Sequence, residues 1–207
     1  LDKWGREDLE NDSYQRFAYG LPPKSKGDYA FVLHMLSSLN AAGTMGVVLP
    51  HGVLFRGAAE GKIRQQILDN NLLDCVIGLP ANLFFGTSIP AAILIFKKNK
   101  TNTNVLFINA SKEFSKNKNQ NEINDEHINK ILTTYEKRQP LEKYSHLATL
   151  AEIQENDYNL NIPRYVDTFE EEAPVDIKQT KQEIETLEKE LFDIKKQMNN
   201  YLTELGL

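Results

Sequence analysis

A chain of 207 residues can bury one sizeable hydrophobic core and still carry an appended segment, so we expect one domain with an extension rather than two equal domains. The formal net charge of −5, from 29 acidic and 24 basic residues, excludes the overall basic field of many autonomous nucleic-acid binders. Any contact with a nucleic acid must therefore be local or shared with a partner. Cys75 is the only cysteine, which excludes an internal disulfide, and it lies in an apolar run typical of a buried strand. With no signal peptide and no membrane-spanning apolar run in the sequence, we expect a cytoplasmic protein without membrane contact.

The first 110 residues alternate between helical and strand patterns. Apolar residues recur at helical spacing between Asp28, placed to cap a helix, and Gly43, placed to end it. Short apolar runs bounded by Gly and Pro follow, as expected of buried strands. The predicted elements are helices at 28–43 and 62–71 and strands at 45–50, 74–80, 91–98 and 104–110. This succession predicts an α/β fold with at least some parallel strands and an antiparallel edge.

The character of the chain changes after Ala110. Residues 111–126 are polar and read as a surface loop, and helices are predicted at 127–137 and 149–156. The irregular stretch "DYNLNIPRYV" follows, and its apolar residues are expected to tie this part back to the domain: Leu160, Ile162, Tyr165 and Val166. We therefore divide the chain into an α/β part at 1–110, a polar loop and helical segment at 111–168, and a terminal part at 169–207.

The terminal part consists of an acidic linker at 169–174 and a predicted helix at 175–205. Apolar residues in this helix step by seven and then by alternating three and four, which indicates a heptad stripe. A single helix cannot bury such a stripe by itself. We expect it to bind another subunit or a second copy of the chain through Ile184, Leu187, Leu191, Ile194 and Met198.

Several sites of known chemistry are absent from the sequence. There is no G-x-G-x-x-G, no G-x-x-x-x-G-K-[ST] and no paired Cys-x-x-Cys, so dinucleotide, phosphate-loop and zinc motifs are excluded. The stretch "LPPK" at 21–24 lacks the Asn and the aromatic residue of the Asn-Pro-Pro-Tyr box of amino-methylating enzymes. We therefore expect neither a metal site nor a catalytic residue in this chain.

Three longer stretches carry a resemblance to a known family. "VLPHGVLF", "LPANLFFGTSIPAAIL" and "DYNLNIPRYV" resemble, in this order, the modification subunit of type I restriction-modification systems, an adenine-N6 DNA methyltransferase. The resemblance implies that the chain is the carboxyl-terminal half of that subunit, with the second half of a Rossmann-like, three-layer methyltransferase sheet and a helical tail. The family's S-adenosylmethionine-binding glycine motif and its Asn-Pro-Pro-aromatic box are expected upstream of Leu1. The complete subunit would use S-adenosylmethionine, whereas this chain alone is expected to bind no cofactor and to be inactive.

The resemblance also assigns a role to the adjacent rings of Phe84 and Phe85. A DNA adenine methyltransferase must flip its target base out of the duplex and hold the face of that base, which an aromatic side chain can do. In this class of enzyme such a motif forms one wall of the base pocket, which implies that one of the two rings stacks on the adenine. Because adjacent residues usually point in opposite directions, we expect the other ring to belong to the core. The alternative is that both rings pack under the edge of the sheet. Gly86 would allow close approach of the backbone, and Thr87 and Ser88 would bond phosphate or the base edge, or cap the turn.

Basic residues near the predicted pocket are candidate phosphate contacts. They are Lys24, Lys26, Arg56 and Lys62, and the alternative is that they are ordinary solvated charges. The implied partners are DNA and the recognition and restriction subunits of the same system. A non-enzymatic interaction module that assembles through its terminal helix is the alternative function.

Overall fold

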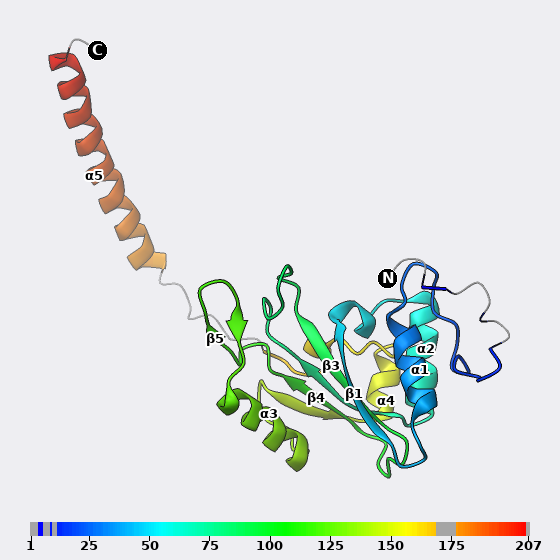
Figure 1. Ribbon diagram of the computed structural model, residues 1–207. Helices are drawn as coiled ribbons and strands as arrows, with labels where there is room; N and C mark the ends of the chain where they lie inside the picture. The colour runs from blue at the N-terminus through cyan, green and yellow to red at the C-terminus, as the bar shows by residue number, and fades with distance from the viewer. Residues whose placement is uncertain (1–3, 6–8, 10–11, 169–176, 206–207) are drawn as a thin grey trace. The chain divides into compact units, whose positions relative to one another are not determined.

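The computed structural model describes residues 4–5, 9, 12–168 and 177–205. The chain divides into two compact units, Leu1–Thr168 and Phe169–Leu207. The first unit contains a twisted sheet with helices on both of its faces, and the second contains one long helix (Figure 1). The expected three-layer α/β architecture is thus confirmed for the first unit.

The elements of the first unit follow the predicted alternation. Its helices are α1 (Asp28–Ser38), α2 (Ala58–Asp69), α3 (Asp125–Lys137) and α4 (Leu150–Glu155), with 3-10 turns η2 (His51–Leu54) and η3 (Ile162–Arg164). The strands of the main sheet are β1 (Thr44–Pro50), β2 (Leu73–Gly78), β3 (Ala91–Lys97), β4 (Val105–Asn109) and β7 (Ser145–Ala148). A separate hairpin consists of β5 (Ser115–Lys116) and β6 (Asn121–Glu122).

The main sheet has the strand order β1-β3-β2-β4-β7. In the described part of this sheet β2 and β4 run parallel, with Cys75 opposite Leu106, and the other three pairs are antiparallel. Both the parallel pair and the antiparallel edges agree with the prediction. The return of β3 between β1 and β2 brings the loop at 79–90 to the end of the sheet where β1 and β2 finish.

Two hydrophobic clusters cover the two faces of the sheet. The larger one joins α1, α2 and α4 to residues such as Val76 and Phe107, and the smaller one joins the α3 side to Cys75 and Ile77. Every residue of β2 is buried, as expected of a central strand covered on both faces. Burial raises the pKa of the Cys75 thiol, so this cysteine is protonated and inert.

The first predicted helix is shorter than expected, and Asp28 does not cap it. α1 ends at Ser38, and Gly43 closes a separate turn by donating its backbone N–H to the Asn40 carbonyl at 3.0 Å. Gly27 is the N-cap residue, and the Asp28 carboxylate instead pairs with Arg56. A local capping signal is overridden here by an ion pair across 28 positions of sequence.

Two strand pairings were not predicted. Residues 111–126, expected to be a loop, contain the β5–β6 hairpin, and β7 adds an edge strand to the main sheet. β7 places part of the segment 111–168 in the same sheet as residues 1–110. The irregular stretch after α4 packs on the domain as predicted, since four of its apolar side chains are buried: Leu160, Ile162, Tyr165 and Val166.

The second unit contains α5 (Ile177–Glu204), which confirms the predicted terminal helix within two residues at its start. The predicted acidic linker, 169–174, lies outside the described residues. No helix in the described ranges combines the length and the apolar character needed to span a bilayer.

Candidate nucleic-acid interface

The loop at 79–90 leaves β2 and returns into β3 through a tight turn. Phe84 and Thr87 form an isolated antiparallel bridge across this turn, and Gly86 adopts a φ of +77° inside it. The Thr87 hydroxyl accepts a hydrogen bond of 3.1 Å from the Ile89 backbone N–H. Thr87 therefore performs the turn-capping role that was one of its predicted alternatives.

The rings of Phe84 and Phe85 both face outward. Phe84 is 46% exposed and Phe85 is 90% exposed, so neither ring belongs to the core. This excludes the alternative in which both rings pack under the sheet, and it also excludes the expectation that one of them would be a core residue. Exposed aromatic rings on a short loop are available for contact with another molecule.

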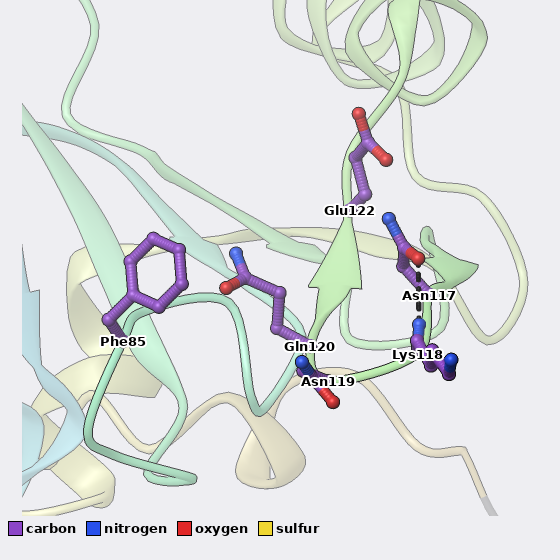
Figure 2. A pocket seen from close by; sticks show the side chains of 6 residues that line it. All are labelled: Phe85, Asn117, Lys118, Asn119, Gln120 and Glu122. Carbon is purple, nitrogen blue, oxygen red and sulfur yellow. Dashed lines mark hydrogen bonds between the residues drawn. The ribbon is translucent and has the colours of Figure 1, made fainter.

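The two rings line different recesses. Phe84 lines one of about 310 Å³ at the end of β1, where the chain also enters β3, with Val48, Leu49, Pro50, Thr87, Ile89, Pro90 and Ala91. Phe85 lines a recess of about 420 Å³ beside the β5–β6 hairpin, with Asn117, Lys118, Asn119, Gln120 and Glu122 (Figure 2). The first recess is almost wholly apolar, whereas the second combines one ring with amides and charged groups.

Gly86 is required for its conformation. A Cβ placed on Gly86 would meet no atom within 4 Å, so close approach of the backbone, which was the predicted reason for glycine, does not apply to this chain alone. Its positive φ is strained for residues with a side chain. Ser88 is exposed, and its carbonyl accepts a hydrogen bond of 3.4 Å from the Asn82 backbone N–H.

The predicted basic contacts do not behave alike. Lys24 and Lys26 are exposed in the loop before α1, Lys62 is exposed on α2, and none of the three lines either recess. Arg56 is an internal ion-pair residue that bonds the carboxylates of Asp28 and Glu60. Its pKa is raised, chiefly by the hydrogen bond to Glu60, and this local pairing argues against the predicted phosphate contact.

His51 lies at the end of β1, next to the Phe84 recess in sequence. Its Nε2 atom is buried and has no hydrogen-bond partner among the described residues, and burial lowers its pKa. The ring is therefore neutral at physiological pH, and His51 does not line the recess itself.

The hairpin residues beside Phe85 were missed by sequence reasoning. The segment "NKNQN" was read only as polar loop, although its Asn-rich composition between two polar runs is typical of a tight turn. The hairpin has too few strand residues for a detectable alternation. Its place beside Phe85 depends on contacts with residues some forty positions away, such as the one between Asn121 and Ala81.

The recess at Phe84 does not fit a cofactor, and the described residues form no metal site. The apolar recess at Phe84 presents no carboxylate that could hold ribose hydroxyls, and the sequence has no glycine-rich phosphate or dinucleotide loop. The described ranges also contain no group of three His, Cys, Asp or Glu side chains able to hold a metal ion.

The predicted docking residues lie on α5 and share one stripe. All five are at least half exposed in the described structure: Ile184, Leu187, Leu191, Ile194 and Met198. Their alternating spacing of three and four places them along one side of the helix. We call these five residues the α5 stripe.

Comparison with known proteins shows the family to which this chain belongs. A family model described as N-6 DNA Methylase matches residues 1–173. The chain belongs to the N-6 DNA methylase family. Within this family it is 38% identical to the methylase subunit of the type I restriction enzyme MjaVII of Methanocaldococcus jannaschii, over 93% of this chain and 36% of that subunit.

Solved structures lead to the same family. The type I methyltransferase subunit of Streptococcus thermophilus is 55% identical, with a TM-score of 0.77, over 80% of this chain and 36% of that one. A structure described as the basis of complex assembly in a type I restriction-modification system shares the fold, with a TM-score of 0.53 and 21% identity, over 84% of this chain and 39% of that one. The chain thus spans a little over a third of the length of these N-6 DNA methylase relatives.

Proposed function

We propose that this chain is part of the modification subunit of a type I restriction-modification system, which methylates adenine N6 in DNA, and that it supplies one wall of the target-base pocket. The observation that carries the proposal is the half-exposed ring of Phe84 in an apolar recess at the end of β1. In open α/β sheets, ligands bind at the carboxyl ends of strands. Membership of the N-6 DNA methylase family makes a flipped adenine the appropriate ligand.

The chemistry of the recess suits a flipped base. An adenine amino group inside a duplex is out of reach, so the base must leave the stack at a cost of a few kcal/mol. Stacking on an aromatic ring returns about 1 to 3 kcal/mol per base, and the exposed face of Phe84 can provide it. The Thr87 hydroxyl lines the same recess and already accepts a bond from Ile89, but its own O–H can still donate to a base edge.

The proposed reaction needs S-adenosylmethionine as methyl donor, and no cofactor loop is found in these 207 residues. We therefore propose that the chain by itself is inactive and that other parts of the subunit hold the cofactor. Titration calorimetry of the 207-residue chain with S-adenosylmethionine should show no stoichiometric binding. A site of micromolar affinity would contradict this division of roles.

The α5 stripe is proposed to bind helices of the recognition subunit, and the assembled enzyme would meet DNA and the restriction subunit. The complex assembly described for the structurally similar type I system supports the search for such partners. The exposed stripe also favours the second candidate function, a non-enzymatic module that only assembles. Methyl transfer by the complete subunit distinguishes the two, since a pure assembly module would show none.

The decisive experiment measures methyl transfer to duplex DNA by the complete methyltransferase carrying this sequence. Phe84→Ala should slow single-turnover methylation about 5- to 150-fold, because it removes the stacking face, and Phe84→Tyr should restore most of the rate. Ile89→Ala is the matched control, since Ile89 is an exposed apolar residue of the same recess without a ring. Equal losses for Ile89→Ala and Phe84→Ala, or no loss for either, would refute the stacking role.

A further inference from the structure

The β5–β6 hairpin holds the backbone of the loop that carries Phe85. The backbone N–H of Asn121 donates to the Asn82 carbonyl at 2.8 Å, and its side-chain Nδ2 donates to the Ala81 carbonyl at 2.8 Å. Gln120 Nε2 donates to the Leu83 carbonyl at 3.3 Å. Three consecutive loop carbonyls, immediately before the phenylalanine pair, are thus bonded to two consecutive hairpin residues.

The hairpin is itself anchored to the domain. Its turn is closed by a bond of 3.1 Å from the Asn117 backbone N–H to the Gln120 carbonyl. Asn124 Nδ2 bonds the Ser115 hydroxyl at 3.3 Å, and Asn124 also caps α3 in a reciprocal capping box with His127. The loop, the hairpin and α3 therefore form one connected structure, and the recess between Phe85 and the turn has defined walls.

The recess beside Phe85 has the composition of a site for a nucleobase. One wall is the exposed face of Phe85, and the other carries the amides of Asn117, Asn119 and Gln120. In Figure 2 the Gln120 amide extends from the hairpin toward the Phe85 ring. Aromatic faces stack on any base, and amide side chains bond base edges, most readily those of adenine.

The charged residues that line the recess suit a nucleotide, with its base and its phosphate group. Lys118 lines the recess and can pair with a phosphate, while Glu122 can accept a hydrogen bond from an exocyclic amino group. A protein partner is less suited to this recess. An apolar anchor residue inserted beside Phe85 would cover the charged groups of Lys118 and Glu122 without bonding them, which costs free energy.

We infer that this recess holds an unstacked nucleobase of the bound DNA, other than the adenine at Phe84, between the Phe85 ring and the amides of the hairpin turn. The inference rests on the proposed function, because it takes DNA as the ligand. It gives the adjacent phenylalanines separate roles, one at the target base and one at a second base. The bonds made by Asn121 make this residue a positioning residue for both rings.

The test uses the complete methyltransferase and duplexes in which 2-aminopurine replaces one base at a time, at the target and at each neighbouring position on both strands. The fluorescence of 2-aminopurine rises when the base leaves its stack. We expect a rise at the target and at one further position. Phe85→Ala should abolish the second rise and increase the KM for DNA about 5- to 150-fold, whereas Phe84→Ala should act mainly on the first rise and on kcat.

A matched pair of lysine variants tests whether DNA contacts the recess itself. Lys118→Gln should weaken DNA binding and reduce the second fluorescence rise, whereas Lys116→Gln, in the same hairpin but outside the recess, should change neither. Asn121→Ala should reduce both rises, and the thermal unfolding temperature of each variant checks that the fold is retained.

Failure of this inference and failure of the proposed function give different results. Absence of methylation and of any rise at the target in the unmodified enzyme would refute the proposed function. Normal methylation with no second rise, or with a second rise that Phe85→Ala leaves unchanged, would refute only the second-base site. Loss of subunit assembly in Phe85→Ala, measured by sedimentation, with an unchanged fluorescence pattern would show that the recess binds protein instead.

Discussion

The buried carboxylate of Asp74 in β2 accepts a hydrogen bond of 2.8 Å from Nη1 of Arg138, the residue that follows α3. The Tyr135 hydroxyl donates to the other carboxylate oxygen at 2.7 Å, and Lys97 Nζ lies 2.9 Å from that same oxygen. Asp74 lies at a register shift between β2 and β3, where the regular alternation of side chains is interrupted. This polar cluster attaches α3, and with it the hairpin side of the site, to the centre of the sheet.

The Asp74 cluster predicts a specific loss of stability in acid. Burial raises the pKa of Asp74, but the hydrogen bonds from Lys97 and Tyr135 and the charge of Arg138 outweigh burial, so the pKa is lowered overall. Its stabilising contribution is present above the unfolded-state pKa of about 3.9 and is lost as pH falls through the folded-state pKa. In urea unfolding between pH 7 and pH 3, the wild type should lose stability in acid more steeply than Asp74→Asn.

Replacing Arg138 by an uncharged residue provides a second test of the Asp74 cluster. Arg138→Met should lower the free energy of unfolding at pH 7 by about 1 to 3 kcal/mol, because it leaves a buried acceptor under-bonded. Lys137→Met, at the neighbouring exposed position, is the control and should have little effect. For the acid prediction above, an equal dependence of unfolding free energy on pH in wild type and Asp74→Asn would contradict the stabilising role of the Asp74 carboxylate.

Gly86 should be intolerant of a side chain for conformational reasons alone. Gly86→Ala forces a residue with a Cβ to a φ of +77°, which costs about 1 to 2 kcal/mol or displaces the loop. Gly86→Asn should be milder, because Asn tolerates this region better. Gly46→Ala is the matched control, since a Cβ there also meets no atom within 4 Å and the backbone of Gly46 is not left-handed. Methylation by the complete enzyme should fall only in the Gly86 variants, and an equal fall in Gly46→Ala would contradict this account.

Variants of Arg56 and of the exposed lysines before α1 should distinguish residues that stabilise the fold from residues that bind DNA. Arg56→Met should lower the free energy of unfolding by about 1 to 3 kcal/mol, because it leaves Glu60, only 2% exposed, without its charged donor. The slope of DNA affinity against salt concentration should not change. The double variant Lys24→Gln, Lys26→Gln should leave stability unchanged and, if both lysines contact phosphate, reduce that slope by about 2. A reduced slope for Arg56→Met at unchanged stability would place Arg56 on the DNA instead.

The α5 stripe should drive association. Burying a side chain such as Leu187 or Leu191 contributes about 1.5 to 3 kcal/mol, so a partner that covers the stripe is strongly stabilised. Replacing both leucines by Lys should abolish self-association of the chain, or binding of the recognition subunit, without unfolding residues 28–110. The control adds the same charge off the stripe, with Gln182→Lys and Thr186→Lys. Sedimentation and pull-down measure the outcome, and equal assembly of the two double variants would exclude docking through the stripe.

Local patterns in the sequence were sufficient for most of the elements and for the family. The sequence was sufficient for the buried runs around Cys75 and Leu94, for a helix at 127–137, observed as α3 at Asp125–Lys137, and for the heptad spacing of α5. All of these depend on the period of apolar residues along the chain. The sequence stretches around Phe84 also indicated the family, because the residues that carry the resemblance are adjacent along the chain. The exposed stripe of α5 is a property of one helix and could be predicted on the same basis.

Tertiary structure alone decided which distant segments meet. The position of β3 between β1 and β2, the addition of β7 and the pairing of Arg56 with Asp28 all join residues whose separation along the chain carries no local signal. The same holds for the two phenylalanines: as neighbours in sequence they look equivalent, but the end of β1 forms a recess at Phe84 and the hairpin forms one at Phe85. Period and turn composition act within a few residues, whereas the surroundings of a side chain are set by hydrogen bonds and packing across the whole domain, which is why the different surroundings of these rings required the structure.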